Sequence, residues 1–189
     1  MAREPQPTLA TARLTLRPFR AEDAEQVTAA AGSCEIARTT LRIPHPYDPR
    51  MAEEFIASVN RGWADGTAAV FAGVESSTGT LVASAGLTIE PEHRRAELGY
   101  WVRVDRWGMG YATEASESLL QLAFTTLGLE RVHAHAFASN PSSIRVLMKI
   151  GMKPEGVLRR HILKWGLWQD MAMFGILRDE RSARCLDGP

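Results

Sequence analysis

The sequence of 189 residues has few cysteines, no long apolar run and no excess of charge of either sign. Its two cysteines, Cys34 and Cys185, are too few and too far apart for a disulfide framework or a metal cluster, so we expect no metal. Free thiols favour a reducing compartment. The longest apolar runs, 68–74 and 81–87, are much shorter than the ~18 residues of a membrane span, and 1–8 lacks the apolar run of a signal peptide. We therefore expect a cytoplasmic protein with no membrane partner.

The charges of the chain are balanced, because lysine and arginine together number 22, as do aspartate and glutamate. Proteins that bind nucleic acid by neutralising phosphates usually have a basic excess, so we expect no nucleic-acid partner. Hydrophobic residues make up 45% and charged residues 23%, which is typical of a globular chain. The chain has no repeat, low-complexity tract or Gly/Ser linker. We predict a single domain over 8–179, followed by a polar tail over 180–189.

Periodicity and turn residues predict a mixture of helices and strands. Strands are predicted at 13–17, 68–74, 80–89, 96–104, 131–138, 157–164 and 168–177, and helices at 21–31, 51–63, about 111–127 and about 141–150, with an irregular loop at 39–49. The glycines at 128 and 151 stand where helices commonly end. The order of elements favours an α/β or α+β fold built on one mixed sheet.

Two strand-to-helix junctions carry the strongest local signals. At the first, Gly108 and Gly110 precede a long helix, so that backbone N–H groups can approach an anion at the positive end of the helix. A diphosphate suits such a loop, although a tight turn that needs glycine for its own geometry is an equal alternative. At the second, Asn140 is a typical cap residue and Pro141 suits the first helical position, and capping alone explains this segment.

Taken together, these junctions resemble the GNAT superfamily of acetyl-CoA-dependent N-acetyltransferases. The loop matches the glycine and alanine positions of the superfamily's diphosphate signature, and Trp107 replaces its Gln or Arg. That replacement is similar to the branch of ribosomal-protein N-terminal (Ala/Ser) acetyltransferases. The resemblance extends over about 14–178 and rests on six segments in order: 14–19 (LTLRPF), 97–101 (ELGYW), 111–115 (YATEA), 140–143 (NPSS), 155–159 (EGVLR) and 168–170 (WQD).

The resemblance implies a GNAT-like mixed, mostly antiparallel sheet of about seven strands, with helices on both faces and a splayed parallel central pair, 96–104 and 131–138. Acetyl-CoA would be the co-substrate, with pantetheine in the gap between these strands and the diphosphate at the glycine loop. The implied cofactor-binding residues are Val102, Arg103, Val104, Trp107, Gly108, Met109, Gly110, Tyr111, Ala112, Thr113, Asn140 and Ser143.

The resemblance also implies direct attack of a primary amine on the thioester, with a backbone N–H near Val102 stabilising the oxyanion. Glu97 is the candidate base, although a solvated strand glutamate is an equal alternative, with water or His135 as the base. Many superfamily members donate a proton to the thiolate from a tyrosine seven residues after the Asn140 position. Leu147 stands there in this sequence, so Ser143 or a water must serve as the acid.

The implied acceptor side comprises His45, Tyr47, Trp101 and His135. A structural or solvated role is the alternative for both His133 and His135, and we interpret His93 and His161 as surface residues. The tryptophans at 63, 101, 165 and 168 are interpreted as packing residues rather than stacking platforms.

The leading interpretation is an N-acetyltransferase for a protein N-terminal α-amine. The same chemistry on a small amine (a polyamine, an aminoglycoside or an amino acid derivative) is the first alternative, and a non-catalytic acyl-CoA-binding module is the second. A polycationic acceptor should favour an acidic cleft, which Glu35, Glu53, Glu54, Glu90 and Glu92 could supply. The resemblance also implies that a homodimer can form.

Overall fold

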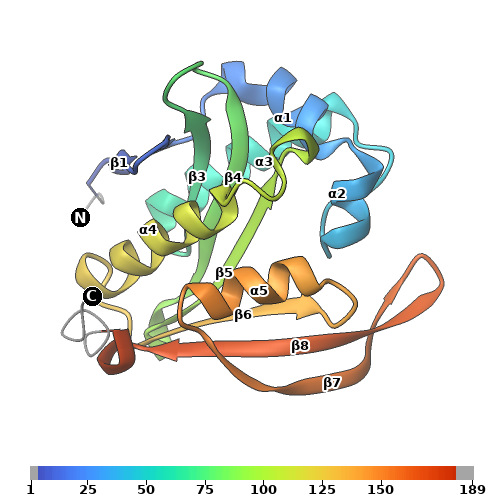
Figure 1. Ribbon diagram of the computed structural model, residues 1–189. Coiled ribbons are helices and arrows are strands. Elements are labelled where there is room, and N and C mark those ends of the chain that lie inside the picture. Colours follow the sequence, from blue (N-terminus) through green and yellow to red (C-terminus); the bar gives the residue numbers. More distant parts are fainter. Residues whose placement is uncertain (1–3, 182–189) are drawn as a thin grey trace.

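The computed structural model describes residues 4–181, and within that range eight strands form one sheet in the order β1-β2-β3-β4-β5-β6-β8-β7 (Figure 1). The strands are β1 (Leu9–Ala10), β2 (Leu14–Arg17), β3 (Ala68–Glu75), β4 (Leu81–Glu90), β5 (Arg95–Val102), β6 (Arg131–Phe137), β7 (Lys153–Lys164) and β8 (Leu167–Leu177). Neighbouring strands are antiparallel except for the parallel pair β5 and β6. The predicted fold class is therefore confirmed, with eight strands rather than about seven, since the two-residue β1 is not among the predicted elements.

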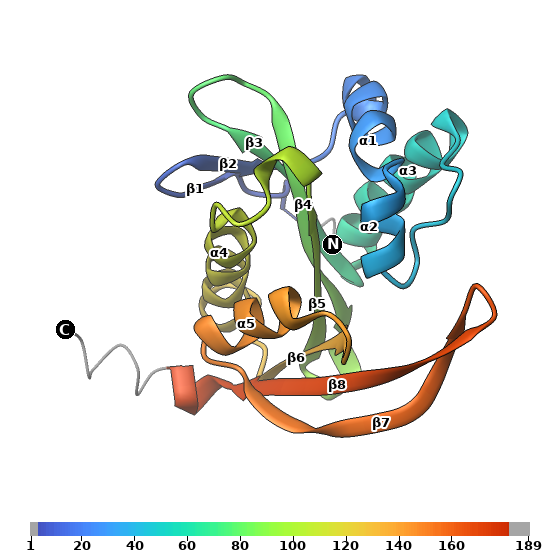
Figure 2. The same ribbon diagram turned by 45° about the vertical axis from the view of Figure 1, so that its right-hand side comes forward.

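Helices cover both faces of the sheet, as predicted (Figure 2). On one face lie α1 (Ala24–Ala31), α2 (Cys34–Thr39) and α3 (Pro49–Asp65), and on the other lie α4 (Tyr111–Thr125) and α5 (Pro141–Lys149). Helix α2 is not among the predicted elements, because a six-residue helix is too short to show a periodic apolar pattern. No helix within residues 4–181 is long and apolar enough to cross a membrane. The predicted tail lies, apart from its first two residues, outside the described residues, as does Cys185.

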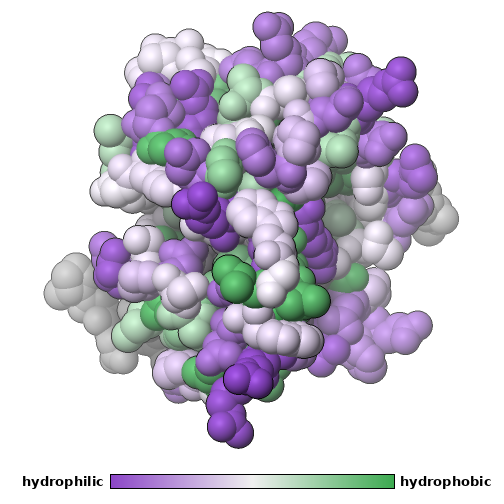
Figure 3. Space-filling view, turned by 90° about the vertical axis from the view of Figure 1, so that its right-hand side faces the viewer, coloured by the Kyte–Doolittle hydropathy of each residue, from purple (hydrophilic) through white to green (hydrophobic). Residues whose placement is uncertain are grey.

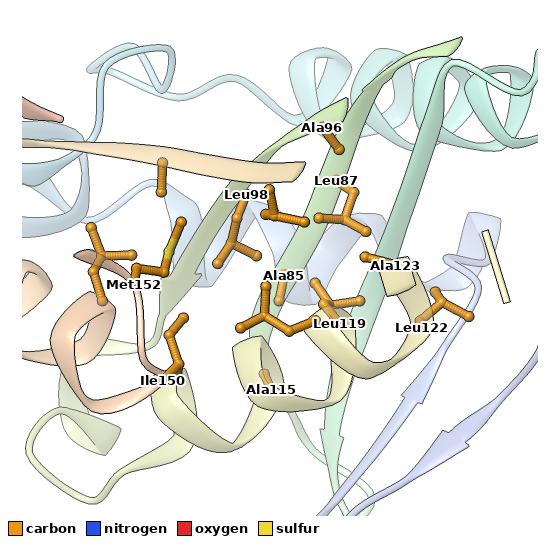
Figure 4. Close-up of a cluster of buried hydrophobic side chains, with 14 of the residues drawn as sticks. Ala85, Leu87, Ala96, Leu98, Ala115, Leu119, Leu122, Ala123, Ile150 and Met152 are labelled. Atoms are coloured by element: carbon orange, nitrogen blue, oxygen red, sulfur yellow. The ribbon is translucent and has the colours of Figure 1, made fainter. Parts of the chain in front are cut away.

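The main hydrophobic core lies between the sheet and α4 (Figure 4). Leu119 of α4 is fully buried, as is Leu87 of β4, and both belong to this cluster together with Leu98 of β5. A second cluster on the other face includes Val27 of α1 and Ile56 of α3. Most of the periodic apolar residues of α3 and α4 thus belong to the clusters that attach these helices to the sheet.

A buried ion pair fixes the path from β2 to α1. The guanidinium nitrogens Nη1 and Nη2 of Arg17 lie 2.7 Å from the two carboxylate oxygens of Asp23, and the amide of Arg20 donates to the same carboxylate at 2.8 Å. Only 4% of the Asp23 side chain is exposed. Because the pair is bidentate and nearly dry, it is a structural link rather than a surface ion pair.

The parallel strands β5 and β6 separate along their length. They pair only over Arg95–Glu97 and Arg131–His133, whereas β5 stays paired with β4 up to Val102 and β6 stays paired with β8 up to Phe137. The two halves of the sheet diverge from that point (Figure 1). The predicted splayed central pair is confirmed, and its gap opens toward the glycine loop that follows β5.

The hairpin of β7 and β8 extends beyond the helices at its turn (Figures 1 and 2). Trp165 is 52% exposed and Trp168 is 57% exposed, so the prediction that they are packing residues is wrong. Trp63 and Trp101 do pack against the two clusters. Figure 3 shows hydrophobic side chains gathered among hydrophilic ones on the face toward which the hairpin turn projects. The hairpin contacts the rest of this face through Lys164, whose Nζ donates to the Thr40 carbonyl.

Candidate active site

The glycine loop forms the uncapped start of α4. Gly108 and Gly110 have φ angles of +75° and +87°, in the left-handed region that favours glycine. Gly110 is the N-cap residue, and no side chain caps the helix there. A Cβ added at Gly108 would find no atom within 4 Å, so the space beside the loop is open. The loop is both a turn that needs glycine and a helix N-terminus with amides free for an anion.

A cleft of about 540 Å³ lies beside this loop. Three cationic side chains and no acidic one are among the residues that line it, and we call it the basic cleft. The cationic residues are Arg106, Arg145 and Lys149, which our sequence reasoning missed, and basic residues one helical turn apart in α5 would have been the signal. The predicted cofactor-binding residues in the lining are Val102, Trp107, Gly108, Gly110, Tyr111, Ala112, Thr113, Asn140 and Ser143. The basic cleft therefore fits a ligand rich in phosphate.

Three of the predicted cofactor residues lie outside that lining: Arg103, Val104 and Met109. The amide of Arg103 donates to the Val82 carbonyl at 2.8 Å and so belongs to the sheet. Because successive amides of a strand point to opposite sides, the amide of Val102 faces the gap toward β6. The Val102 carbonyl accepts a 2.7 Å hydrogen bond from Nε1 of Trp107. The amide of Val102 is therefore directed toward the gap, where a ligand can reach it.

Buried polar contacts tie the start of α4 to the strands behind it. The Tyr111 hydroxyl donates to the Glu75 carboxylate, which also accepts from the Thr78 hydroxyl at 2.8 Å. These hydrogen bonds hold the pKa of Glu75 below its usual value. The guanidinium of Arg13 stacks 4.4 Å from the centre of the Tyr111 ring and donates to the Met109 carbonyl at 2.8 Å. The loop is thus held from outside the cleft.

A second cleft, of about 920 Å³, lies between β4–β6 and the helices α2 and α3, and we call it the large cleft. Tyr47, Trp101, His135 and Glu97 line it, as predicted for the acceptor side. His45 is not among its lining residues, because its ring turns outward and Nδ1 lies 3.2 Å from the Gly32 carbonyl. The predicted residues are therefore brought together with the exception of His45.

Glu97 lies on β5 within the large cleft. One of its oxygens is 3.6 Å from Nδ1 of His135, the other is 3.8 Å from Nη2 of Arg42, and 26% of its side chain is exposed. Its carboxylate can reach a proton on a molecule in this cleft, and His135 lies beside it at more than hydrogen-bond distance. Neighbouring His133 is half-buried, and burial lowers its pKa. That result fits the structural role that we gave as an alternative for His133.

The charges that line the large cleft nearly cancel, with three carboxylates against two guanidinium groups. The acidic residues in the lining are Glu54, Asp65 and Glu97, and the basic ones are Arg42 and Arg61, with His135 beside them. Of the five glutamates that could have supplied an acidic acceptor cleft, Glu54 alone is in the lining. Most of the other lining residues are apolar or uncharged.

The two clefts meet at the end of β5 and the start of α5. Five residues line both clefts: Thr39, Thr40, Tyr100, Trp101 and Ser143. As predicted, the Asn140 side chain caps α5 by accepting from the Ser143 amide at 3.1 Å. The Tyr100 hydroxyl lies 2.9 Å from the Ser143 hydroxyl. Sequence reasoning missed Tyr100, although its place in segment 97–101 on the splayed strand was a usable signal.

The chain is similar in sequence and in fold to known proteins. A family model described as an acetyltransferase (GNAT) domain matches residues 13–153. The uncharacterized N-acetyltransferase p20 of Bacillus licheniformis is 32% identical over 174 residues, which are 92% of this chain and 97% of that protein.

Two solved structures share the fold. The ribosomal-protein-S5-alanine acetyltransferase of Vibrio fischeri superposes with a TM-score of 0.82 and 16% identity, covering 92% of this chain and 97% of that one. A chimera of the spermidine N-acetyltransferase of Vibrio cholerae gives a TM-score of 0.77 and 22% identity, covering 90% and 99%.

Proposed function

This chain belongs to the GNAT acetyltransferase family and is an acetyl-CoA-dependent N-acetyltransferase, and on that premise we propose that its acceptor is the α-amine of a protein N-terminus. Acetyl-CoA supplies an acetyl thioester, whose carbonyl carbon the amine attacks directly. The amine enters through the large cleft and acetyl-CoA through the basic cleft, so that they meet at the junction of the two.

The basic cleft is suited to the phosphates of acetyl-CoA. The uncapped N-terminus of α4 offers free amides at Gly110 and beyond, and the open space beside Gly108 leaves room for a diphosphate. Arg145 and Lys149 in the lining add a favourable charge, whereas Arg106 is already paired with Asp105 and Glu75. The gap between β5 and β6 would receive the pantetheine arm, with the Val102 amide available to the oxyanion that forms during attack.

On the acceptor side, Glu97 would take the proton that the amine must lose. An α-amine has a pKa of ~7.7–8.0 and is partly neutral at pH 7, whereas a lysine amine at ~10.4 needs a stronger base. A carboxylate that is partly exposed and only 3.6 Å from His135 suits the lighter task. Ser143 lies at the junction of the clefts and would assist departure of the thiolate. It would take this role because Leu147 stands where many superfamily members have a tyrosine.

The observation that carries the choice of acceptor is the small net charge of the large cleft, in which carboxylates exceed guanidinium groups by only one. The named structural neighbours include enzymes for a ribosomal protein and for spermidine, so the shared fold alone does not choose between these acceptors. A polyamine carries several positive charges and is best held by several unpaired carboxylates, whereas Arg42 and Arg61 offset two of the three carboxylates here. A polypeptide N-terminus needs one carboxylate and an open, partly apolar channel.

A panel of amines tests the proposal through release of free CoA thiol. The panel contains peptides with a free N-terminus, the same peptides blocked at the α-amine but with a lysine, spermidine, and free amino acids. We expect thiol release with the unblocked peptides and little with their blocked counterparts. Faster turnover of spermidine or of the lysine peptides would contradict the acceptor assignment. Acetyl-CoA binding with no turnover of any amine would favour the non-catalytic module.

A further inference from the structure

Tyr100 is the one phenol that reaches both clefts. It belongs to β5, on the face opposite Glu97. The other residues that line both clefts are Thr39, Thr40, Trp101 and Ser143. Since the acetyl thioester must lie where the two clefts meet, the hydroxyls there are the ones that can face its sulfur.

The Tyr100 hydroxyl has two oxygens of Ser143 within reach. Its Oη lies 2.9 Å from Oγ of Ser143 and 3.3 Å from the carbonyl oxygen of the same residue. Either hydroxyl can donate in the 2.9 Å contact, and the arrangement that bears on catalysis is the one in which Tyr100 donates to Ser143. When that hydroxyl accepts the hydrogen of Tyr100, its own hydrogen is left to point elsewhere, and the open direction is the junction of the clefts.

Burial of the Tyr100 ring raises the pKa of its phenol to about 12. The phenol therefore keeps its proton from about pH 6 to 9 and can donate its hydrogen to Ser143 throughout that range. A phenol this weak does not give up its proton to a thiolate of pKa ~8.5. Tyr100 is consequently not suited to be the terminal acid.

We propose that Tyr100 is a positioning residue that turns the Ser143 hydroxyl hydrogen toward the sulfur of departing CoA. The proposal rests on the role of Ser143 in the proposed function and is independent of which amine is the acceptor. As the nitrogen–carbon bond forms and the carbon–sulfur bond breaks, the electron pair of the latter stays on sulfur. The Ser143 hydroxyl donates a hydrogen bond to that sulfur, Glu97 takes the proton of the amine, and solvent supplies the proton that completes the thiol.

A double-mutant cycle tests this arrangement. Tyr100→Phe removes only the phenol oxygen, Ser143→Ala removes the hydroxyl that it orients, and Ser143→Thr keeps a hydroxyl at the same position. Single-turnover acetyl transfer and CoA affinity are measured for each variant with whichever amine the wild-type enzyme acetylates. Failure of the acceptor assignment shows in the wild type alone, whereas failure of this proposal shows in the variants.

We expect Tyr100→Phe to slow the single-turnover step about tenfold, with CoA affinity unchanged. The loss should be the same from about pH 6 to 9, because the phenol keeps its proton throughout that range. Ser143→Ala should be slower by about 10- to 100-fold, and adding Tyr100→Phe to it should cost nothing more. Ser143→Thr should recover part of the rate.

Three results would overturn the proposal. If the two losses multiply, Tyr100 acts on the substrate without Ser143. If Tyr100→Phe lowers CoA affinity and leaves the rate unchanged, its hydroxyl is a cofactor ligand. If Tyr100→Phe changes neither quantity, the contact with Ser143 has no part in the reaction.

Discussion

Replacing Gly108 by leucine should remove acetyl-CoA binding without a special cost to the fold. Gly108 has φ of +75°, and Gly79 in the β3–β4 turn has φ of +70°, so a leucine at either meets a similar backbone penalty of about 1–2 kcal/mol. A Cβ at either position finds no atom within 4 Å. The difference is that Gly108 lines the basic cleft and Gly79 lines neither cleft. Gly79→Leu is therefore the matched control.

The expected size of the effect follows from ligand linkage. Acetyl-CoA at 100 times its dissociation constant adds about 2.7 kcal/mol to the free energy of unfolding. For a domain of this size each kcal/mol raises Tm by about 2–4 °C, so the wild type should gain about 5–11 °C. The assay is thermal unfolding of each protein with and without acetyl-CoA.

Both variants should start from a similarly lowered Tm, and only Gly79→Leu should keep the gain. A full gain in Gly108→Leu would refute the placement of the diphosphate at this loop. Loss of the gain in both variants would show that strain in the backbone, rather than lost space, abolishes binding. If millimolar acetyl-CoA does not raise the Tm of the wild type, the assignment of the cofactor site to this cleft is wrong.

Two further predictions concern titrating groups. Glu97→Gln should lower kcat/KM by about 100-fold or more below neutral pH, where the amine is protonated and needs a base most. A pH profile that overlays the wild type from about pH 6 to 9 would instead show that Glu97 is a solvated strand residue. Asp23→Asn should lower the free energy of unfolding in urea by about 3 kcal/mol, because it leaves Arg17 buried without its carboxylate. Burial opposes the charge of Asp23, but hydrogen bonds from Arg17 and the Arg20 amide outweigh it and hold its pKa below 3.8. Stability from this carboxylate is therefore complete above about pH 4 and is lost as the pH falls through the lowered pKa, and an Asp23→Asn protein that shows the wild-type acid sensitivity would contradict this origin.

The sequence predicts best those parts of the site that local geometry determines. A left-handed φ at Gly108 and a cap at Asn140 depend on a few neighbouring residues, and both are where the sequence places them. Glu97 and Trp101, which the resemblance implies for the reaction and the acceptor side, both line the large cleft because they lie on the same face of β5. Each of these features is set within one turn or one strand.

Features that depend on distant segments could not be predicted in this way. Tyr100 and Ser143 are 43 residues apart, and their contact exists because the end of the splayed β5 meets the start of α5. Arg103 was expected among the cofactor residues because its neighbours are, yet pairing with β4 turns its amide away. Trp165 has a large apolar side chain of the kind that usually packs in a core. It is exposed because its hairpin extends past the helices that would have covered it.

The two outer edges of the sheet have a consequence for how copies of the chain can associate. At one edge β1 is only two residues long, and at the other β7 is interrupted by register shifts after Pro154 and between Leu158 and Ile162. Proline offers no amide hydrogen, and a bulge breaks the regular row of groups that a foreign strand would need. Both edges are therefore poor templates for cross-β growth, and we expect a dimer of this chain to form through side-chain contacts rather than through a sheet continued across two subunits.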